Sequence, residues 1–259
     1  MPPLTFGSLF AGIGGVDLGF ERAGMNCVWQ VELADLPRRI LAKHWPATRR
    51  HDDVRTFPPS DPTEWNCDII CGGFPCKQTS TIAAVHGNRL GLAGKDSGLW
   101  FEMLRVVRLV QPRWVVVENV AGAITYKAQV EGGLADAGYR ILEGPARVSA
   151  EGVGAPHRRW RLFWVAHRDE PGLALTRLPD PPQAEREPGR TADGNLWLQA
   201  LAGVLRVDDG LPGGVDRRER INALGNAVVP AAAEWVGRCI VAAENPIPTV
   251  DALAEDHED

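Results

Sequence analysis

Short apolar runs alternate along residues 1–168 with longer segments whose apolar positions recur at helical spacing. The run at 4–9 leads through a glycine-rich stretch into a helical segment at 16–23, which is the order strand, loop, helix. Strands that alternate with helices predict a doubly wound, mostly parallel α/β sheet with helices on both faces. Further strands are predicted at 27–31, 68–71, 114–117 and 162–165, and further helices at about 36–45, 99–109 and 231–243.

The pattern changes after residue 168. Residues 169–193 contain five prolines and many charged side chains without a sustained period, so we expect a loop there. A short helix is predicted at 196–205, and the acidic segment 251–259 is expected to be a flexible tail. The chain thus divides into a core at 1–168, an intervening region at 169–216, a C-terminal segment at 217–250 that returns to the core, and the tail.

Composition is typical of a soluble globular enzyme. Apolar residues make up 44% and charged residues 24% of the 259 residues. No apolar run approaches the ~20 residues that cross a bilayer, and the N-terminus lacks a signal-peptide pattern, so we expect a cytoplasmic protein without a membrane partner. The net charge of -5 argues against a generally basic surface, although phosphate binding needs only a local positive face.

The five cysteines form no recognisable framework. Their odd number and scattered positions predict thiols rather than disulfides. Cys67, Cys71 and Cys76 cluster, but their spacings differ from those of zinc-ligand pairs and no histidines follow at ligand spacing. We therefore expect no metal site.

The glycine-rich stretch after the first strand indicates a nucleotide-like ligand, because glycine lets the backbone approach closely. The third glycine of a dinucleotide fingerprint would fall at Asp17, which disfavours a nicotinamide cofactor. Glu32 ends the second strand, where a carboxylate can accept hydrogen bonds from ribose hydroxyls, and Asp53 follows the next helix in a similar position. Either could be an ordinary strand-end carboxylate, but together with the glycines they favour an adenosyl site.

Cys76 follows the strand at 68–71 directly after Pro75, and Glu118 and Asn119 follow the strand at 114–117. A lone cysteine is more often a buried core residue than a nucleophile. Here an acid is expected at the same edge of the sheet, where sites of α/β proteins assemble. A partly buried carboxyl group has a raised pKa and can donate a proton at neutral pH, which favours a catalytic reading of both residues.

Five segments carry a resemblance that extends from residue 10 to residue 230, excepting about 169–216. In chain order they read FAGIGG at 10–15, GFPC at 73–76, ENV at 118–120, HRRWR at 157–161 and GNAVVP at 225–230. They resemble the ordered motifs of the bacterial and phage DNA cytosine-5 methyltransferases, many of which belong to restriction-modification systems. The resemblance implies a class I S-adenosylmethionine-dependent methyltransferase fold with a reduced target-recognition lobe at 169–216.

The resemblance also implies the reaction and its catalytic residues. Cys76 would add to C6 of a flipped cytosine while Glu118 protonates N3, and C5 would then take the methyl group of S-adenosylmethionine. Asn119 would brace the loop that carries Cys76. Arg159 and Arg161 would hold the flipped nucleotide; without the resemblance they would read as phosphate contacts or surface charge.

By the same resemblance, one set of residues is expected to bind the cofactor S-adenosylmethionine, and another set is expected to bind the partner, double-stranded DNA. Asn226 and Leu99 also have ordinary structural readings, as a helix N-cap and as a core residue. The cofactor set is Phe10, Gly12, Gly14, Glu32, Asp53, Gly73, Leu99, Asn226 and Val228, and the DNA set is Lys77, Gln78, Ser80 and Arg89.

Three departures from the family pattern concern DNA recognition more than chemistry. Lys77 and His157 each stand where the family usually has glutamine, and the region 169–216 is short. Fewer side chains can then reach base edges, which predicts a short recognition site. We expect a monomer. Two alternatives stay open: an RNA cytosine-5 methyltransferase, and a catalytically inactive homologue that binds DNA, against which the intact Cys76, Glu118, Arg159 and Arg161 argue.

Overall fold

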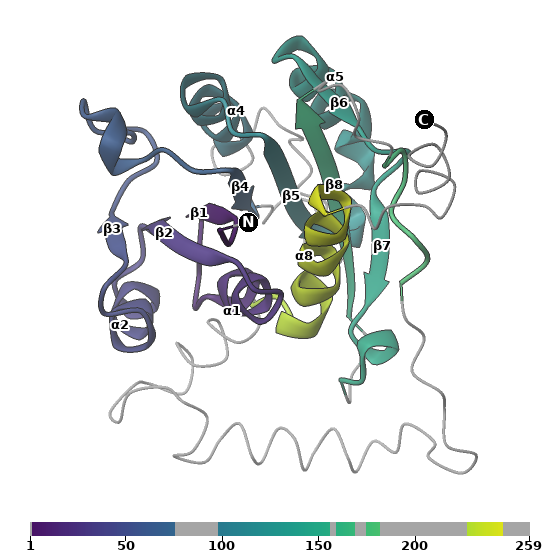
Figure 1. Cartoon of the computed structure of the whole chain (residues 1–259), viewed down its shortest axis with the longest axis horizontal. Coiled ribbons are helices and arrows are strands. Elements are labelled where there is room, and N and C mark those ends of the chain that lie inside the picture. Colours follow the sequence, from purple (N-terminus) through teal and green to yellow (C-terminus); the bar gives the residue numbers. More distant parts are fainter. Residues whose placement is uncertain (1, 76–97, 156–158, 169–174, 182–226, 246–259) are drawn as a thin grey trace, which may run out of the picture.

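The computed structural model of the chain describes residues 2–75, 98–155, 159–168, 175–181 and 227–245. Within these residues, eight strands form one sheet in the order β3-β2-β1-β4-β5-β8-β6, and β7 pairs with β8 (Figure 1). The elements in chain order are β1 Thr5–Leu9, α1 Gly15–Arg22, β2 Asn26–Val31, α2 Asp35–His44, β3 Arg49–His51, η1 Pro62–Glu64, β4 Ile69–Gly72, α4 Leu99–Val110, β5 Trp114–Val120, η3 Ala121–Tyr126, α5 Lys127–Asp136, β6 Tyr139–Ile141, β7 Ala146–Ser149, η4 Glu151–Val153, β8 Trp160–Arg168 and α8 Pro230–Glu244.

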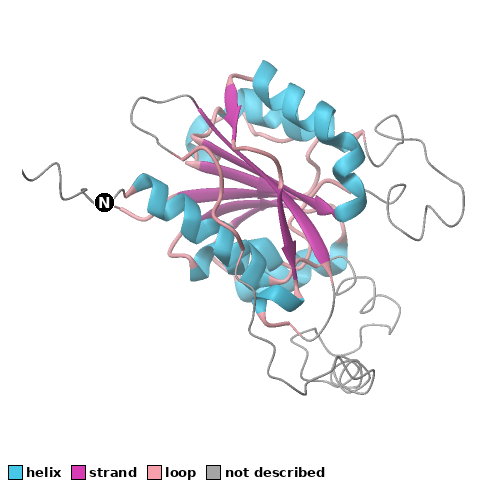
Figure 2. Cartoon of the chain, turned by 90° about the vertical axis from the view of Figure 1, so that its right-hand side faces the viewer, coloured by secondary structure: helices cyan, strands magenta, loops and turns pink. Residues whose placement is uncertain are grey.

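The strand directions fit the predicted class. Strands β3, β2, β1, β4 and β5 run parallel, whereas β8 lies antiparallel between β5 and β6. Helices cover both faces of the sheet (Figure 2). The prediction of a doubly wound, mostly parallel α/β sheet is confirmed.

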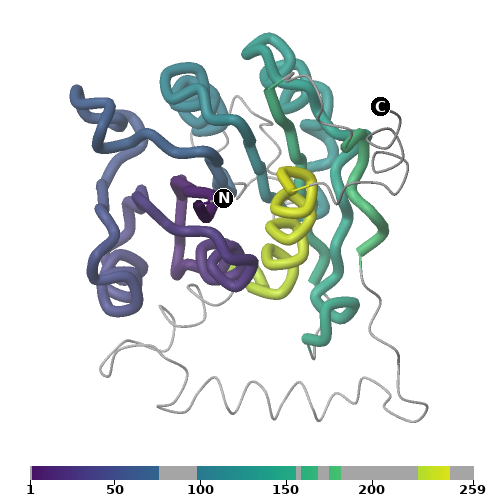
Figure 3. Tube along the Cα trace, viewed as in Figure 1, coloured from purple at the N-terminus to yellow at the C-terminus, as the bar shows by residue number. Residues whose placement is uncertain are grey.

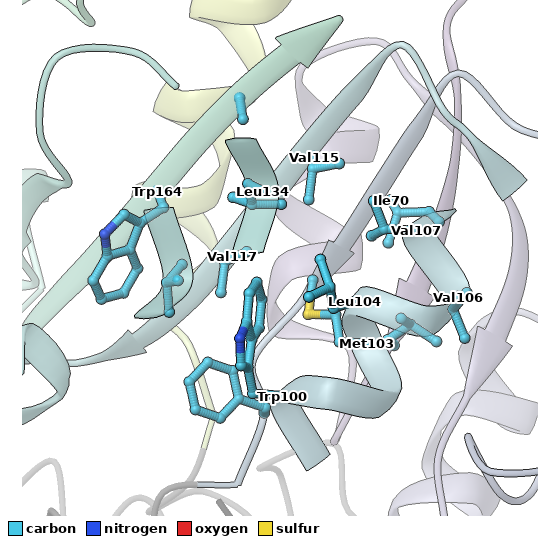
Figure 4. Close-up of a cluster of buried hydrophobic side chains, with 14 of the residues drawn as sticks. Ile70, Trp100, Met103, Leu104, Val106, Val107, Val115, Val117, Leu134 and Trp164 are labelled. Carbon is cyan, nitrogen blue, oxygen red and sulfur yellow. The ribbon is translucent and has the colours of Figure 1, made fainter. Parts of the chain in front are cut away.

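Helix α4 covers one face of the sheet through its apolar side. Met103 and Leu104 pack among Val115 and Val117 of β5, and all four are buried (Figure 4). Successive side chains of a strand point to opposite faces, so alternate residues of β5 serve this cluster. Trp114 and Val116, which alternate with these residues along β5, belong to the cluster on the other face of the sheet, which α1 and α8 cover.

Helices α1 and α8 lie side by side although the sequence separates them widely (Figure 3). A Cβ on Gly19 would lie 2.5 Å from the Pro230 carbonyl oxygen and 2.6 Å from the Ala233 Cβ, and a Cβ on Gly237 would lie 2.8 Å from the Ala23 Cβ. Glycine at these positions lets the two helices approach closely. The segment that precedes α8 is thereby brought to the start of α1.

Three described strands and one described α-helix were not predicted, nor were the short 3-10 helices. Strand β3 consists of polar residues, and β6 and β7 are short. Helix α5 buries only Val130 and Leu134, so its apolar pattern is weak. The predicted helix at 196–205 lies outside the described residues, as do the acidic tail and most of 169–216.

One boundary matters for the site. Strand β5 does not end at Val117 but continues through Glu118 and Asn119 to Val120. The extension forms because β8 pairs with it along its whole length, to the pair Val120 and Arg161. None of the described helices is long and apolar enough to span a bilayer.

Candidate active site

The carboxyl ends of the parallel strands meet at one edge of the sheet. Leu9 at the end of β1 pairs with Val31 of β2 and with Gly72 of β4, and Gly72 pairs in turn with Val117 of β5. Ligands of open α/β sheets bind beyond this edge. The ends of these strands and the segments that follow them hold most of the described residues that the sequence assigned to a site.

Glu118 lies buried at this edge, in close contact with the segment that follows β4. A Cβ on Gly73 would lie 2.4 Å from its Oε2, so only glycine fits there without a shift. Its Oε1 lies 2.6 Å from Nε of Arg161, an ion pair in which the N–H is not aligned for a hydrogen bond. Burial raises the pKa of Glu118 to about 7, against the opposing effect of Arg161 and Arg159. This carboxyl group therefore holds a proton in part of the molecules at neutral pH.

Two guanidinium groups accompany this one carboxyl group. Arg161 is 8% exposed, and burial lowers its pKa while Glu118 raises it. Burial and the charge of Arg161 together lower the pKa of Arg159 to about 10, against the opposing effect of Glu118. Both remain cations at neutral pH, so the cluster carries net positive charge and favours an anionic group or a carbonyl oxygen.

Asn119 fixes the backbone of the segment that follows β4. Its Nδ2 donates to the carbonyl oxygen of Phe74 at 3.0 Å, and its Oδ1 accepts from the backbone N–H of Val120 at 2.9 Å. Phe74 is itself buried, with its ring centroid 5.7 Å from that of Trp100. The described segment that leads to Cys76 is thus held by a hydrogen bond and by core packing.

Several residues with predicted roles lie outside the described ranges, so their roles stay predictions. They are Cys76, Lys77, Gln78, Ser80, Arg89, His157 and Asn226.

The glycine loop after β1 closes onto Glu32. The backbone N–H of Gly12 donates to Oε2 of Glu32 at 2.8 Å, and that of Ala34 donates to Oε1 at 2.8 Å. Phe10 and Gly12 have φ angles of 55° and 57°, a left-handed conformation that is uncommon for phenylalanine. The positive φ angles of Phe10 and Gly12 shape a loop that brings the Gly12 N–H to the Glu32 carboxylate.

The glycine loop also packs against Trp45, which follows α2, and against the segment that precedes α8. A Cβ on Gly14 would lie 2.4 Å from the ring of Trp45, and a Cβ on Gly15 would lie 2.4 Å from the carbonyl oxygen of Val228. Val228 is buried just before α8. The tertiary fold therefore brings Val228 to the glycine loop, as a shared binding site requires.

Asp53 follows β3, and its carboxylate is engaged by a neighbour in sequence. Arg55 donates from its backbone N–H at 3.0 Å and from Nε and Nη2 at 2.9 and 2.8 Å. These hydrogen bonds lower the pKa of Asp53. Its carboxylate remains charged at neutral pH and can still accept a further hydrogen bond.

The amino-acid sequence matches a known protein family over most of its length. The family model described as C-5 cytosine-specific DNA methylase matches residues 4–196. The chain belongs to this family. The matched range holds the glycine loop, Glu32, Glu118, Arg159 and Arg161, whereas Val228 lies beyond it.

Curated relatives of the chain are named type II methyltransferases. The chain is 33% identical to M.NgoFVII of Neisseria gonorrhoeae over 183 residues, which cover 69% of the chain and 47% of the relative. It is 28% identical to M.HpaII of Haemophilus parainfluenzae over 187 residues, which cover 68% and 49%. The chain spans about half the length of these relatives.

Two solved structures place the fold. An E. coli prophage protein described as a DNA modification methyltransferase matches with a TM-score of 0.53 and 25% identity, over 69% of the chain and 52% of its own. A mutant of Spodoptera frugiperda DNMT2 matches with a TM-score of 0.67 over 92% and 99%, and at 14% identity this likeness concerns the fold alone. The sheet and helices form the class I S-adenosylmethionine-dependent methyltransferase fold.

One contact beside the residues predicted to bind the cofactor was not found from the sequence. Nη2 of Arg105, on α4, donates to the carbonyl oxygens of Val54 at 2.7 Å and Phe57 at 2.8 Å, and its Nε pairs with Glu102 at 2.8 Å. It thereby ties the turn that follows Asp53 to the helix that Leu99 begins. An arginine on a helix has no sequence signal for such a role, because its partners are backbone atoms far along the chain.

Proposed function

We propose that the protein transfers the methyl group of S-adenosylmethionine to C5 of cytosine in DNA. The observation that carries the proposal is the buried Glu118, with its pKa near 7, packed on Gly73 just before Cys76 and paired with Arg161. A carboxyl group protonated at neutral pH is the acid that this reaction requires. Membership of the methylase family supports the same reaction.

The reaction has to make C5 of cytosine nucleophilic, because C5 of the unmodified ring does not attack a methyl group. The thiolate of Cys76 adds to C6 while Glu118 delivers its proton to N3, so the C5–C6 double bond becomes an electron-rich enamine. C5 would then attack the methyl group that S-adenosylmethionine supplies when bound, and S-adenosylhomocysteine would leave. Loss of the C5 proton to solvent water or hydroxide restores the C5–C6 double bond and expels the Cys76 thiolate, and N3 returns its proton to the Glu118 carboxylate. Arg161 keeps the Glu118 carboxylate in place between these steps and is itself a donor for the carbonyl oxygen of the base.

The described loops fit S-adenosylmethionine, which supplies an electrophilic methyl group when bound. The carboxylate of Glu32 accepts two backbone N–H groups and retains lone pairs for ribose hydroxyls. Open space at Gly12, where an added Cβ would meet no atom within 4 Å, leaves room for a ligand beside the loop. We assign the cofactor residues as predicted from the sequence: Phe10, Gly12, Gly14, Glu32, Asp53, Gly73, Leu99, Asn226 and Val228.

The substrate must leave the base stack, at a cost of a few kcal/mol, before Cys76 can reach it. Arg159 and Arg161 would hold the extruded nucleotide, and Lys77, Gln78 and Arg89 would contact the duplex together with Ser80. We assign 169–216 to a reduced target-recognition region and 217–250 to a segment that returns to the core. We also propose that the DNA sequence recognised by the protein is short.

Methyl transfer from labelled S-adenosylmethionine to mixed-sequence duplex DNA tests the proposal. Wild-type protein should label DNA and form a covalent adduct with DNA that contains 5-fluorocytosine, whereas Cys76→Ser should do neither. Transfer to tRNA alone would establish the RNA alternative instead. Binding of S-adenosylhomocysteine without transfer to either nucleic acid would establish the inactive homologue.

A further inference from the structure

Trp160 is a large aromatic residue at the surface of the candidate active-site edge. It begins β8 between Arg159 and Arg161, and it is 43% exposed whereas Arg161 is 8% exposed. Trp160 pairs with Ser149, the last residue of β7, next to the pair of Arg161 with Val120. Trp160 is therefore the immediate sequence neighbour of the arginine that contacts Glu118, yet it faces solvent.

An exposed arginine covers this ring. The Cζ of Arg147, on β7, lies 4.5 Å from the centroid of Trp160. Within the described part of the chain, no carboxylate lies at ion-pair distance from Arg147. Its charge is therefore not neutralised by these residues, and the contact with the ring holds the guanidinium at the surface.

The pair matches the chemistry of a nucleic-acid strand. Exposed aromatic rings stack on bases or sugars, and a nearby guanidinium binds phosphate. Arg147 places positive charge over the ring, although the chain as a whole carries a net charge of -5. Positive charge gathered at the site edge of an acidic protein complements a polyanion more specifically than it complements a protein surface.

We propose that Arg147 and Trp160 form a contact for the DNA strand beside the flipped nucleotide. Arg147 binds a backbone phosphate, and Trp160 packs on the adjoining sugar or base. Trp160 and Arg161 are successive residues of β8, so their side chains lie on opposite faces of the sheet, and this contact would hold the strand while Arg161 stays paired with Glu118. The inference rests on the proposed function, since it takes duplex DNA as the substrate.

The test compares Trp160→Ala and Arg147→Ala with the wild type and with Arg140→Ala. Arg140 is an exposed arginine of β6 that pairs with His167, at the other end of β8, and serves as the matched control. Affinity for a fluorescein-labelled mixed-sequence duplex is measured by anisotropy over a range of salt concentrations. Affinity for S-adenosylhomocysteine is measured by calorimetry on the same preparations.

Trp160→Ala should weaken DNA binding about tenfold, and Trp160→Phe should restore most of it because a ring is kept. Arg147→Ala should reduce the slope of log K against log salt by about one, whereas Arg147→Lys should keep the slope. The control should match the wild type, and affinity for S-adenosylhomocysteine should be unchanged in every variant.

Two results would overturn the inference. The first is a DNA affinity of the variants equal to that of the control, and the second is a parallel loss of S-adenosylhomocysteine affinity, which would show a structural role. The proposed function has a separate readout. Wild-type protein that binds duplex DNA but transfers no methyl group would refute the proposed function. The DNA affinities of the variants would still decide whether Arg147 and Trp160 contact DNA.

Discussion

Replacing Gly19 by alanine tests the packing of α1 on α8. The added Cβ would lie 2.5 Å from the Pro230 carbonyl oxygen, 2.6 Å from the Ala233 Cβ and 2.7 Å from the Glu234 nitrogen. Two of these atoms are backbone atoms of α8, so no side chain can turn aside to make room. The helix itself has to move. Gly132, in the middle of α5, is the matched control, because an added Cβ there would meet no atom within 4 Å.

The expected magnitude follows from two opposing effects. Alanine in place of glycine within a helix stabilises a protein by roughly 0.5–1 kcal/mol, and this gain applies to both positions. Overpacking of a tight contact costs about 1–3 kcal/mol and applies only to Gly19. The gain cancels in the comparison, so Gly19→Ala should be less stable than Gly132→Ala by about 1–3 kcal/mol.

Urea unfolding of the wild type and both variants at one pH measures this difference as a change in midpoint at constant slope. Gly19→Ala should also bind S-adenosylhomocysteine more weakly than Gly132→Ala, because a shift of α8 moves Val228 away from Gly15. If Gly19→Ala were as stable as Gly132→Ala, the close approach of α1 and α8 would be refuted.

Three further predictions concern the site. Glu118 keeps a proton in the folded protein that the unfolded chain releases, so stability should fall as the pH rises from about 4.5 to about 7. Glu118→Gln should have a shallower slope than the wild type, because the buried Asp17, whose pKa is raised to about 6, contributes in the same window. Urea midpoints at pH values across this window check it, and equal slopes would contradict the raised pKa of Glu118. Arg105→Ala should weaken S-adenosylhomocysteine binding without changing the KM for DNA, whereas the exposed Arg108→Ala should not. The Arg105 effect should shrink in an Asp53→Asn background, and an undiminished effect would show that Arg105 does not act through Asp53. Asn119→Ala leaves the Phe74 carbonyl oxygen without this partner and should cost about 1–3 kcal/mol by urea unfolding; it should lower kcat with unchanged S-adenosylhomocysteine affinity, and an unchanged kcat would argue against the bracing role.

Local sequence patterns determined the class of the fold and the main parts of the sheet. Apolar runs such as 114–117 have to be buried wherever they lie, and glycines such as Gly12 mark a backbone conformation that other residues rarely adopt. Both signals are carried by neighbouring residues. The strand and helix order could therefore be predicted, except where an element is polar, as in β3, or weakly patterned, as in α5.

The environment of each site residue was decided only by the tertiary structure. The contact of Glu118 with Arg161 depends on the antiparallel register of β8 on β5, and a shift by one residue would turn Arg161 to the other face of the sheet. The turn after Asp53 is held by Arg105, whose partners are carbonyl groups that carry no sequence signal. The sequence could name an acid beside a predicted nucleophile. Its raised pKa comes from burial, and burial is a property of the folded chain.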